Sequence, residues 1–530
     1  MSVQSDLSIY IIGSGPASIS CAQALVDDGY PVVILDAGIE LEAERQQVVD
    51  ALLASPNWDK DALASLKAGT DATVSGIPVK KHFGSDYPYR EVLENLSVQA
   101  HHVRTFASFA KGGLSNVWGA QVLPYLAEDI TDWPITTAEL EPYYKAVFDF
   151  MPLAATHDDL AEIFPLHSDT YQPLTPSWQA KRLLRHLDKH RAYLRDKGFI
   201  YGASRLAMYV QQSCEEPKGC IYCGLCMYGC PHNAIYSAAQ TLNHLVRKKK
   251  VSYVKDVVVD RVEEAGETVR IHAHDRLSGA SKTFDAARVF LGTGVLPTAK
   301  ILLKSLQQPG ATLTMRDSQY FLLPLLGFYG ASCFSHSNLH TLAQVFIEIV
   351  DQALGNHPVH LNIYTYNELY EQALKHLLGK AYSFLKYPAN LILDRLMVIQ
   401  GNLHSDISET ATVSLQGDTL IVQRKENPLA AKTVRMVVKK LYCNALSLGF
   451  VPLSPLLKIG VPGQGVHTGG TFPMRHNPGN FETDIYGRPT GLQRVHVVDA
   501  SVLPSIPSTT ITLTIMANAY RIGKEWHHGA

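Results

Sequence analysis

Apolar residues near the start of the chain fall into two short runs separated by a helical pattern. The runs are LSIYII at 7–12 and PVVILDAG at 31–38, and both have the length of a buried strand. Between them, GSGPAS at 13–18 leads into ISCAQALVDDG, in which apolar residues recur at helical spacing. The pattern predicts a strand–helix–strand unit of a parallel sheet.

Patterns farther along the chain predict further helices and a second sheet. Helices are expected at 39–70 and at 176–197, an amphipathic stretch whose charges form a solvated face. The segment 310–458 holds strand candidates at 343–350, 359–366 and 419–425 and a helix candidate at 429–449. Its aromatic residues fit core packing better than a pocket wall; they include Tyr364, Tyr366 and Tyr370. We expect a mixed or antiparallel sheet backed by helices.

Length and charge restrict the class of protein. A chain of 530 residues, 46% of them apolar, is too long for one core, so two or more lobes are expected. The formal net charge of −2 gives no basic excess for nucleic acid. No basic residues precede the first apolar run, so it does not read as a secretory signal. The most apolar stretch, 320–334, is too short for a bilayer and contains Pro324. We therefore expect a cytoplasmic protein without a transmembrane segment, whose cysteines are thiols or metal ligands.

The turn after the first strand has the residues of a dinucleotide site. Gly13 permits the tight turn, Gly15 lets the backbone approach a pyrophosphate, and Ser18 takes the third small position. The following helix would direct free N–H groups at the phosphates, and Asp36 would bind a ribose. A glycine turn in an ordinary parallel sheet is the alternative. The acidic residue 23 positions after Gly13, at the end of the second strand, favours the nucleotide site.

Four of the eight cysteines lie within eleven residues, in CIYCGLCMYGCP at 220–231. Cys220, Cys223, Cys226 and Cys230 have the spacing C-x2-C-x2-C-x3-C-P, which is the iron–sulfur run of bacterial ferredoxins. Zinc is the main alternative, although its sites usually use two cysteine pairs with a longer spacer. A metal-free loop of packed thiols is a further alternative. The remaining cysteines that we expect in the core are Cys21, Cys333 and Cys443.

Several separated segments resemble the glucose–methanol–choline (GMC) oxidoreductases, a family of FAD enzymes that act on alcohols and sugars. They are GSGPAS, AKGGLSNVWGAQ (110–121), DWPITTAELEPYY (132–144), ARVFLGTGVLPTAKILLKS (287–305) and the segment from GVHTGGT to TTITLT (465–514). Residues 39–100 and 306–455 match the family poorly. The resemblance implies an α/β fold, α+β overall, with a Rossmann-like FAD lobe assembled from discontinuous pieces and a separate substrate lobe.

The resemblance also implies domain limits and cofactor contacts. The FAD lobe is expected at 1–309, with a cysteine-rich iron–sulfur loop at 214–231; the substrate lobe at 310–458; and a return to the FAD lobe at 459–530. The residues expected to bind FAD are Gly13, Gly15, Pro16, Ala17, Ser18, Asp36, Ala37, Gly112, Gly113, Ser115, Asn116, Trp118, Gly119, Val257, Gly292, Thr293, Gly294, Asp499, Ala500, Thr510 and Thr512.

Two positions depart from the family pattern. Members with a covalently bound flavin have a histidine before the tryptophan of SNVW, where this chain has Val117, so FAD is expected to bind non-covalently. The family also pairs one histidine with a second Asn or His near the C-terminus. His467 fits the first position, and Thr510 stands at the second. A threonine hydroxyl can donate a hydrogen bond but does not ionise near neutral pH, so the role of base falls on His467. Other histidines kept as alternatives are His404, His476 and His496.

The cysteine run adds an electron path to this expectation. Some bacterial FAD-linked glucose dehydrogenases of the family hold a three-iron cluster with C-x5-C-x3-C-P, which Cys220, Cys226 and Cys230 match. Cys223 or Cys214 would complete a four-iron cluster, so 4Fe-4S and 3Fe-4S both stay open. The sequence predicts a dehydrogenase that oxidises an alcohol or sugar-like substrate and passes electrons to an external protein or quinone-like acceptor. The alternatives are an oxygen-using oxidase with a structural cysteine loop and a non-catalytic flavoprotein subunit.

Overall fold

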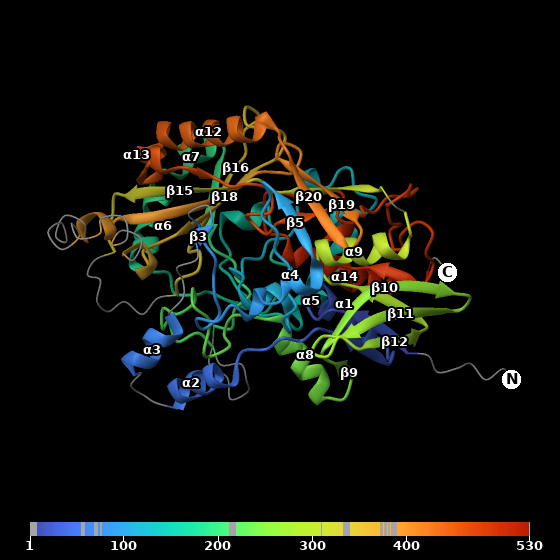
Figure 1. The fold of residues 1–530 in the computed structure, drawn as a ribbon. Coiled ribbons are helices and arrows are strands. Elements are labelled where there is room, and N and C mark those ends of the chain that lie inside the picture. Colours follow the sequence, from blue (N-terminus) through green and yellow to red (C-terminus); the bar gives the residue numbers. More distant parts are fainter. Residues whose placement is uncertain are drawn as a thin grey trace.

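The computed structural model describes residues 8–54, 59–67, 73–74, 77–210, 219–308, 310–331, 340–371, 375, 379, 382 and 390–528. Figure 1 shows a layer that contains β15, β16 and β18 beside helices α12 and α13, and a second region around α1, α9 and α14. The fold is mixed α/β, as the sequence predicts. Among the helices that the model describes, none has the length and apolar character needed to cross a membrane.

A parallel sheet of five strands contains the predicted strand–helix–strand unit. Its order is β24 (Val495–Val497), β13 (Arg288–Leu291), β1 (Ile9–Ile12), β2 (Val32–Leu35) and β9 (Val251–Val254). In the register, Ile11 of β1 lies between Ile34 and Phe290. Nearly every residue of these strands is apolar, because both faces of the sheet are covered.

Helices cover one face of this sheet. They are α1 (Pro16–Asp27), α8 (Ala238–Arg247) and α14 (Thr512–Glu525). One buried cluster joins Ile9 and Ile11 to Leu25 of α1 and Ile522 of α14. The close approach of α1 and α14 depends on Gly523, where a Cβ would lie 2.9 Å from the Cβ of Ala24. The N-terminal and C-terminal parts of the chain therefore form one structural unit.

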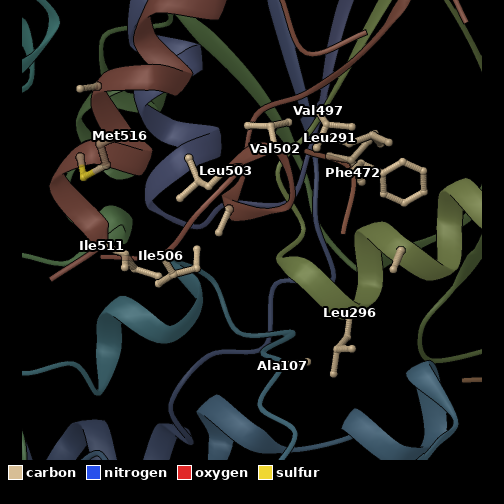
Figure 2. Packing of buried hydrophobic residues seen from close by; sticks show 14 of the residues in the cluster. Ala107, Leu291, Leu296, Phe472, Val497, Val502, Leu503, Ile506, Ile511 and Met516 are labelled. Atoms are coloured by element: carbon tan, nitrogen blue, oxygen red, sulfur yellow. The ribbon is translucent and has the colours of Figure 1, made fainter. Parts of the chain in front are cut away.

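The opposite face packs against α9 (Val295–Ser305) and an antiparallel sheet. The strands of that sheet are β10 (Val257–Ala265), β11 (Thr268–Asp275) and β12 (Ser281–Ala286). Figure 2 shows how Leu291 of β13 and Val497 of β24 lie near Phe472 and Val502, with Leu296 of α9 below them. Side chains far apart in the sequence thus share one core beside the C-terminal edge of the parallel sheet.

The second layer is built on a sheet of seven strands, six of which follow one path with antiparallel neighbours. The path is β21 (Phe450–Pro452), β15 (Tyr320–Gly327), β18 (Leu396–Asn402), β17 (Val359–Tyr364), β16 (Val345–Ile349) and β8 (Phe199–Ala203), and β22 (Lys458–Ile459) pairs with β15. Its apolar face packs on α6 (Trp178–Lys189) and α12 (Pro428–Cys443), flanked by α7 (Arg191–Asp196) and α13 (Ala445–Leu448). The strand candidates at 343–350 and 359–366 are thereby confirmed as β16 and β17.

A mixed sheet of five strands connects the two layers. Its order is β23 (Thr468–Gly469), β14 (Thr312–Asp317), β19 (Thr410–Gln416), β20 (Thr419–Lys425) and β5 (Val98–His101). Strand β5 pairs in parallel with β20, and β8 joins the seven-stranded sheet from a position before residue 309. Both sheets of this part of the molecule therefore recruit strands from outside 310–458.

Further helices, strands and 3₁₀ turns are found in the described part of the chain. They are α2 (Ala43–Ala54), α3 (Lys60–Lys67), α4 (Val92–Leu96), α5 (Thr137–Phe148), β3 (Thr73–Val74), β4 (Ile77–Pro78), β6 (Leu153–Ala154) and β7 (Tyr171–Gln172), with 3₁₀ turns η1 (Tyr87–Tyr89), η2 (Gly113–Asn116), η3 (Ala127–Asp129), η4 (Asp159–Glu162), η6 (Ser454–Leu456) and η7 (Ala500–Val502). Cys21 is buried in α1, whereas the prediction of a core position for Cys443 is wrong. Cys443 ends α12 and falls off the stripe that runs from Ala430 to Leu441 on its buried face. Cys333 lies outside the described residues.

Candidate functional site

A cavity of about 400 Å³ lies where the turn after β1 meets the C-terminal segment and the seven-stranded sheet. Its wall includes Gly13 and Gly15 at one end and Tyr364, Gln400 and His467 at the other. The cavity thus extends from the carboxyl edge of the parallel sheet to the polar face of the second layer. In open α/β sheets, ligands bind at this edge.

The first turn is shaped by close backbone contacts. Gly13 has φ of +93°, and a Cβ there would lie 3.0 Å from the carbonyl oxygen of Gly292. The Ser18 hydroxyl donates to that same carbonyl at 3.0 Å. Helix α1 begins at Pro16 with Gly15 as its N-cap, and no side chain caps it. The uncapped helix start facing the cavity suits the phosphates of a dinucleotide.

Asp36 follows β2 and lines the cavity. Its Oδ2 accepts hydrogen bonds from the Ser14 hydroxyl at 2.5 Å and from the Tyr253 hydroxyl at 2.8 Å. Burial raises the pKa of Asp36 to about 6, against the opposing effect of these hydrogen bonds. Binding of a ribose hydroxyl is the role expected of an acid at this position.

The loop from Lys111 to Gln121 lies against the first turn. The Gly112 N–H donates to the Ser14 hydroxyl at 2.9 Å, and a Cβ on Gly113 would lie 3.3 Å from the Cα of Gly15. Asn116 holds the loop from within, because its Nδ2 donates to the carbonyls of Lys111 and Gly113 at 2.9 and 2.8 Å. This loop, which we call the flavin loop, places Val117, Trp118 and Gly119 on the cavity wall.

Asp499 fixes the opposite edge of the cavity. Its Oδ2 accepts from the Gly294 N–H at 2.8 Å and from the Thr298 hydroxyl at 2.5 Å, and its Oδ1 accepts from the Ser501 N–H at 2.9 Å. Burial raises the pKa of Asp499. The carboxylate therefore ties the start of α9 to the C-terminal segment.

Most of the residues predicted to bind FAD line this one cavity. They are Gly13, Gly15, Pro16, Ala17, Asp36, Ala37, Gly113, Ser115, Trp118, Gly119, Val257, Gly292, Thr293, Gly294, Asp499, Ala500, Thr510 and Thr512. Ser18, Gly112 and Asn116 are not on the wall and instead hold the turn and the flavin loop in place.

His467 reaches the cavity from the end of a strained loop. Its Nδ1 is buried and has no hydrogen-bond partner among the described residues. Burial, assisted by the charge of His360, lowers the pKa of His467 to about 4. The preceding residue, Val466, has φ of +62°, a conformation that β-branched residues rarely adopt. Strain of this kind collects at functional sites, where the surrounding structure enforces it.

Thr510 lies on the same wall, and its hydroxyl oxygen accepts a hydrogen bond from the Leu123 N–H at 3.1 Å. The hydroxyl proton stays free to donate into the cavity. The other candidate histidines lie elsewhere. His496 donates from Nδ1 to the Tyr486 carbonyl at 2.8 Å, His476 is exposed, and His404 belongs to a separate cluster with Asp129.

A polar wall of the seven-stranded sheet is the part of the site that we did not predict. Tyr364 and Gln400 line the cavity, and the Tyr364 hydroxyl accepts from Gln121 Nε2 at 2.7 Å and donates to Gln400 Oε1 at 3.3 Å. On the same face of β17, His360 bonds Glu348 through Nδ1 and Asn362 Oδ1 through Nε2, the latter at 2.8 Å. In VHLNIY, the sequence of β17, every second residue is polar. Because alternate residues of a strand share one face, this alternation is the sequence pattern that indicates a polar wall.

Cys220, Cys223, Cys226 and Cys230 are brought into one loop, which we call the cysteine loop (219–236). Cys226 is 5% exposed, while Cys220 and Cys223 are half-exposed. Backbone N–H groups approach the sulfurs, from Tyr222 to Cys220 at 3.4 Å and from Ala234 to Cys230 at 3.2 Å. Such N–H contacts are among the features that tune iron–sulfur clusters.

The electrostatics of the thiols also indicate a shared ligand. Burial raises the pKa of Cys220 and of Cys223 to about 12, and the charges of Cys226 and Cys230 add to the shift at both. A negative charge on one of these sulfurs thus opposes ionisation of the neighbouring thiols. A bound cationic metal cluster removes this opposition. Cys214, the alternative fourth ligand, lies outside the described residues.

The spacing of the sulfurs tests the zinc alternative. In the part of the chain that the model describes, no three of the four sulfurs lie within 4.8 Å of one another. Four sulfurs at 2.3 Å from one tetrahedral zinc ion would be about 3.8 Å apart. The described sulfurs are therefore not arranged around a single tetrahedral zinc ion.

Another group of metal-binding residue types, Asp129, His357 and His404, has ligand atoms within 4.8 Å of one another. The rings of His357 and His404 are stacked, with centroids 3.6 Å apart and planes 12° from parallel. Lone pairs in two stacked rings run side by side and do not converge on one ion. His357 instead bonds Asp129 at 3.0 Å and Asp406 at 3.3 Å, which makes it a cation between two carboxylates.

Two family models match the chain. Residues 460–519 match the model of the C-terminal domain described as GMC oxidoreductase, and residues 216–236 match the model described as 4Fe-4S binding domain. No curated protein sequence matches the chain.

Solved structures match over nearly the whole length. Pyridoxine 4-oxidase from Mesorbium loti has a TM-score of 0.61 at 14% identity, covering 98% of this chain and 99% of its own. A variant of the formate oxidase of Aspergillus oryzae RIB40, from work on FAD modification, has a TM-score of 0.64 at 14% identity, covering 99% of each chain. A second variant of that oxidase has a TM-score of 0.62 at the same identity and coverage.

The family model matches the C-terminal segment, and the solved structures match nearly the whole chain. The C-terminal match includes His467, Asp499 and Thr510, which line the cavity, and the structural matches extend the shared fold to the first turn and the second layer. The C-terminal segment is thus similar to that of the GMC oxidoreductases, and the chain as a whole shares the fold of pyridoxine 4-oxidase and formate oxidase.

Proposed function

We propose that this chain is an FAD-dependent dehydrogenase that oxidises a C–OH group of an alcohol or sugar-like substrate and passes electrons through an iron–sulfur cluster. The observation that carries the proposal is the buried, unpartnered Nδ1 of His467 on a cavity wall that also holds the dinucleotide turn. An unpaired imidazole nitrogen at this position is suited to a substrate hydroxyl.

The residues of the first turn would hold FAD without a covalent bond. The start of α1 would bind the pyrophosphate, and Asp36 would bind a ribose hydroxyl. Val117, at the position where a linking histidine would stand, has no atom that can form the link. Bound FAD would supply the hydride acceptor for the reaction.

His467 would remove the proton of the substrate hydroxyl as hydride leaves the carbon. Its lowered pKa, about 4, keeps the imidazole neutral near pH 7 and able to accept a proton. Thr510 would donate a hydrogen bond to the same substrate oxygen. Gln121, Tyr364 and Gln400 would hold the rest of a polar substrate, because amide and hydroxyl groups pair with hydroxyls as donor and acceptor.

The cysteine loop would carry electrons away from the cavity. Trp118 lines the cavity and donates through Nε1 to the carbonyl of Tyr236 at 2.8 Å, and the two rings are 6.4 Å apart. The loop presents Cys226 to the interior and Cys220 and Cys223 toward its half-exposed side. An iron–sulfur cluster there would take electrons one at a time toward an external acceptor.

An oxygen-using oxidase is the second candidate. It is favoured by the similar solved structures, pyridoxine 4-oxidase and formate oxidase, both of which are oxidases. In that case the cysteine loop would serve the fold alone. A flavoprotein subunit without turnover is the third candidate, and the threonine at position 510 is the feature that favours it.

One anaerobic experiment separates the three. We expect purified protein to contain flavin, iron and acid-labile sulfide, and its flavin to bleach when an alcohol or sugar from a panel is added without air. Re-oxidation by an artificial electron acceptor should be much faster than by oxygen. Rapid re-oxidation by oxygen would support the oxidase, and flavin that no member of the panel bleaches would support the subunit without turnover.

A further inference from the structure

A short segment, residues 79–89, lies between the cysteine loop and the cavity. On one side, the Phe83 N–H donates to the carbonyl of Tyr228 at 2.6 Å. Close packing continues at Gly229, where a Cβ would lie 2.6 Å from the ring of Phe83. On the other side, Tyr89 lines the cavity and donates from its hydroxyl to the Lys80 carbonyl at 3.0 Å. The segment therefore contacts both proposed redox sites.

Lys80 of this segment contacts the flavin loop and lies within electrostatic range of the cysteine loop. Its Nζ donates to the carbonyl of Trp118, in the flavin loop, at 3.0 Å. The charges of Cys226 and Cys230 also act on it, and they raise its pKa against the effect of burial, which lowers the pKa to about 8 overall. Among the residues that the model describes, no carboxylate forms an ion pair with Lys80. Cys226 and Cys230, which become thiolates when they bind a metal, are thus the groups of opposite charge that act on this ammonium group.

A second lysine near the cysteine loop shows the contrast. Lys67 lies 5.5 Å from the ring centroid of Tyr228, but its ammonium forms an ion pair with Glu368 at 2.7 Å. Its charge is therefore already compensated. Lys80 lacks such a partner in the described part of the chain and remains free to compensate charge on the thiolates.

We propose that Lys80 is the counter-cation of the cluster that the cysteine loop holds and that it joins this cluster to the flavin loop through Trp118. The inference rests on the proposed iron–sulfur cluster. A cluster with thiolate ligands is anionic and gains one further negative charge on reduction. A nearby positive charge stabilises the reduced state more than the oxidised state, so Lys80 raises the reduction potential of the cluster. A higher potential favours electron flow from the flavin toward the cluster.

The test measures the midpoint potential of the cluster by redox titration followed by electron paramagnetic resonance, together with iron, sulfide and flavin content. The variants are Lys80→Met, which removes the charge, and Lys80→Arg, which keeps it. Lys81→Met is the matched control, because it makes the same charge change one residue farther along the chain. We expect Lys80→Met to titrate at a clearly lower potential than the parent, and Lys80→Arg and Lys81→Met to titrate close to the parent.

The outcomes are distinct. Loss of iron and sulfide from Lys80→Met with full retention in Lys80→Arg would support the same role, since a cation would then be needed to hold the anionic cluster. A Lys80→Met protein with the parent's iron, sulfide and potential would overturn it, as would cluster loss in both Lys80 variants. A parent protein without iron and sulfide would instead refute the proposed electron path and remove the basis for a counter-cation.

Discussion

At the scale of single residues, the site combines a strained backbone with an unpaired imidazole. Val466 has φ of +62° and precedes His467, whose Nδ1 is buried without a partner. The carbonyl of His467 accepts a hydrogen bond from the Ser318 N–H at 3.1 Å. This bond fixes the backbone immediately after the strained residue. Strain and an unmet hydrogen bond both cost folding free energy, and both would serve substrate binding.

The base itself gives the most direct test. We expect His467→Ala to slow anaerobic flavin reduction by about 100- to 10,000-fold, since a positioned base typically contributes that much. Thr510→Val should have a milder effect on the reaction, because it removes at most one hydrogen bond to the substrate oxygen, worth about 0.5–1.5 kcal/mol, besides the structural bond from the Leu123 N–H. Stopped-flow absorbance of the flavin measures both, and flavin content shows that the cofactor is retained. A parent-like rate in His467→Ala would assign the base to another residue.

The low pKa of His467 predicts the pH profile. A base must be unprotonated to act, so flavin reduction should be constant near neutral pH and fall as the pH drops toward 4. His360 helps to lower this pKa, so His360→Gln should move the fall to higher pH. The measurement is the rate of flavin reduction between pH 4 and 8 for both proteins. An unchanged profile would mean that His360 does not act on His467.

The strain at position 466 can be relieved. Glycine tolerates positive φ, which removes about 1–2 kcal/mol of strain, while its freedom in the unfolded chain costs about 0.5–1 kcal/mol. We expect Val466→Gly to unfold at an equal or slightly higher denaturant concentration yet to reduce its flavin more slowly, since His467 is less firmly placed. Val466→Ala is the control, because it keeps a side chain in the strained conformation. A Gly variant that is both less stable and fully active would contradict this account.

At the scale of elements, one histidine holds together two loops that are far apart in the sequence. His357 precedes β17 and lies between Asp129 of η3 and Asp406, which follows β18. Its hydrogen bonds to both carboxylates raise its pKa to about 9. Ser505 of the C-terminal segment also donates to the Asp129 carbonyl, at 3.2 Å. The cluster therefore connects the second layer to the segment that carries Thr510.

We call the hydrogen bonds of His357 to Asp129 and Asp406 the clasp. Because they depend on a protonated His357, the protein should be less stable at alkaline pH. The pKa of His357 is higher in the folded than in the unfolded protein, so its contribution is complete below pH 6.5 and disappears as the pH rises through 9. Asp406 is 55% exposed, and solvent screening reduces the effect to about 1–2 kcal/mol. Denaturant unfolding at several pH values from 6 to 10 should show the loss in the parent and a smaller loss in His357→Gln. Equal pH dependence in the two proteins would argue against the clasp.

Local patterns predict the elements well, because each depends on residues close together in the chain. The run of β1, the turn at Gly13 and the spacing of the cysteines are visible within a few residues. The contacts between residues far apart in the sequence are not visible in such local patterns. Lys80 lies about 140 residues before the cysteine loop, and the electrostatic effect of that loop on it arises only because both pack against Trp118. His360 was missed for the same reason, since its relation to His467 arises from the packing of two layers.

At the scale of the whole molecule, one cavity is bounded by several separate parts of the chain. Its wall takes residues from 12–17, 104–121, 257–259, 292–301 and 463–515, among others. A molecule that fills such a cavity contacts all of them at once. Binding to the folded state alone therefore stabilises the entire fold and not one lobe.

Removal of FAD should consequently lower the melting temperature. We expect acid precipitation to leave the yellow colour in the supernatant, because Val117 cannot bind FAD covalently. The refolded or stripped apoprotein should melt at a lower temperature than the holoprotein, and FAD at about 100 times its Kd should restore about 2.7 kcal/mol. Differential scanning calorimetry with and without added FAD makes the comparison. Colour that stays in the pellet would show a covalent link.

The order of strands in the parallel sheet has a consequence for biosynthesis. Strand β1 is made long before the edge strand β24 and helix α14, which covers α1. Chains are synthesised from the N-terminus and domains generally fold as units. The dinucleotide turn is therefore completed only after β24 and α14 have left the ribosome. Until then the apolar face of α1 needs protection, and we expect the cofactor to enter only after these elements have been made.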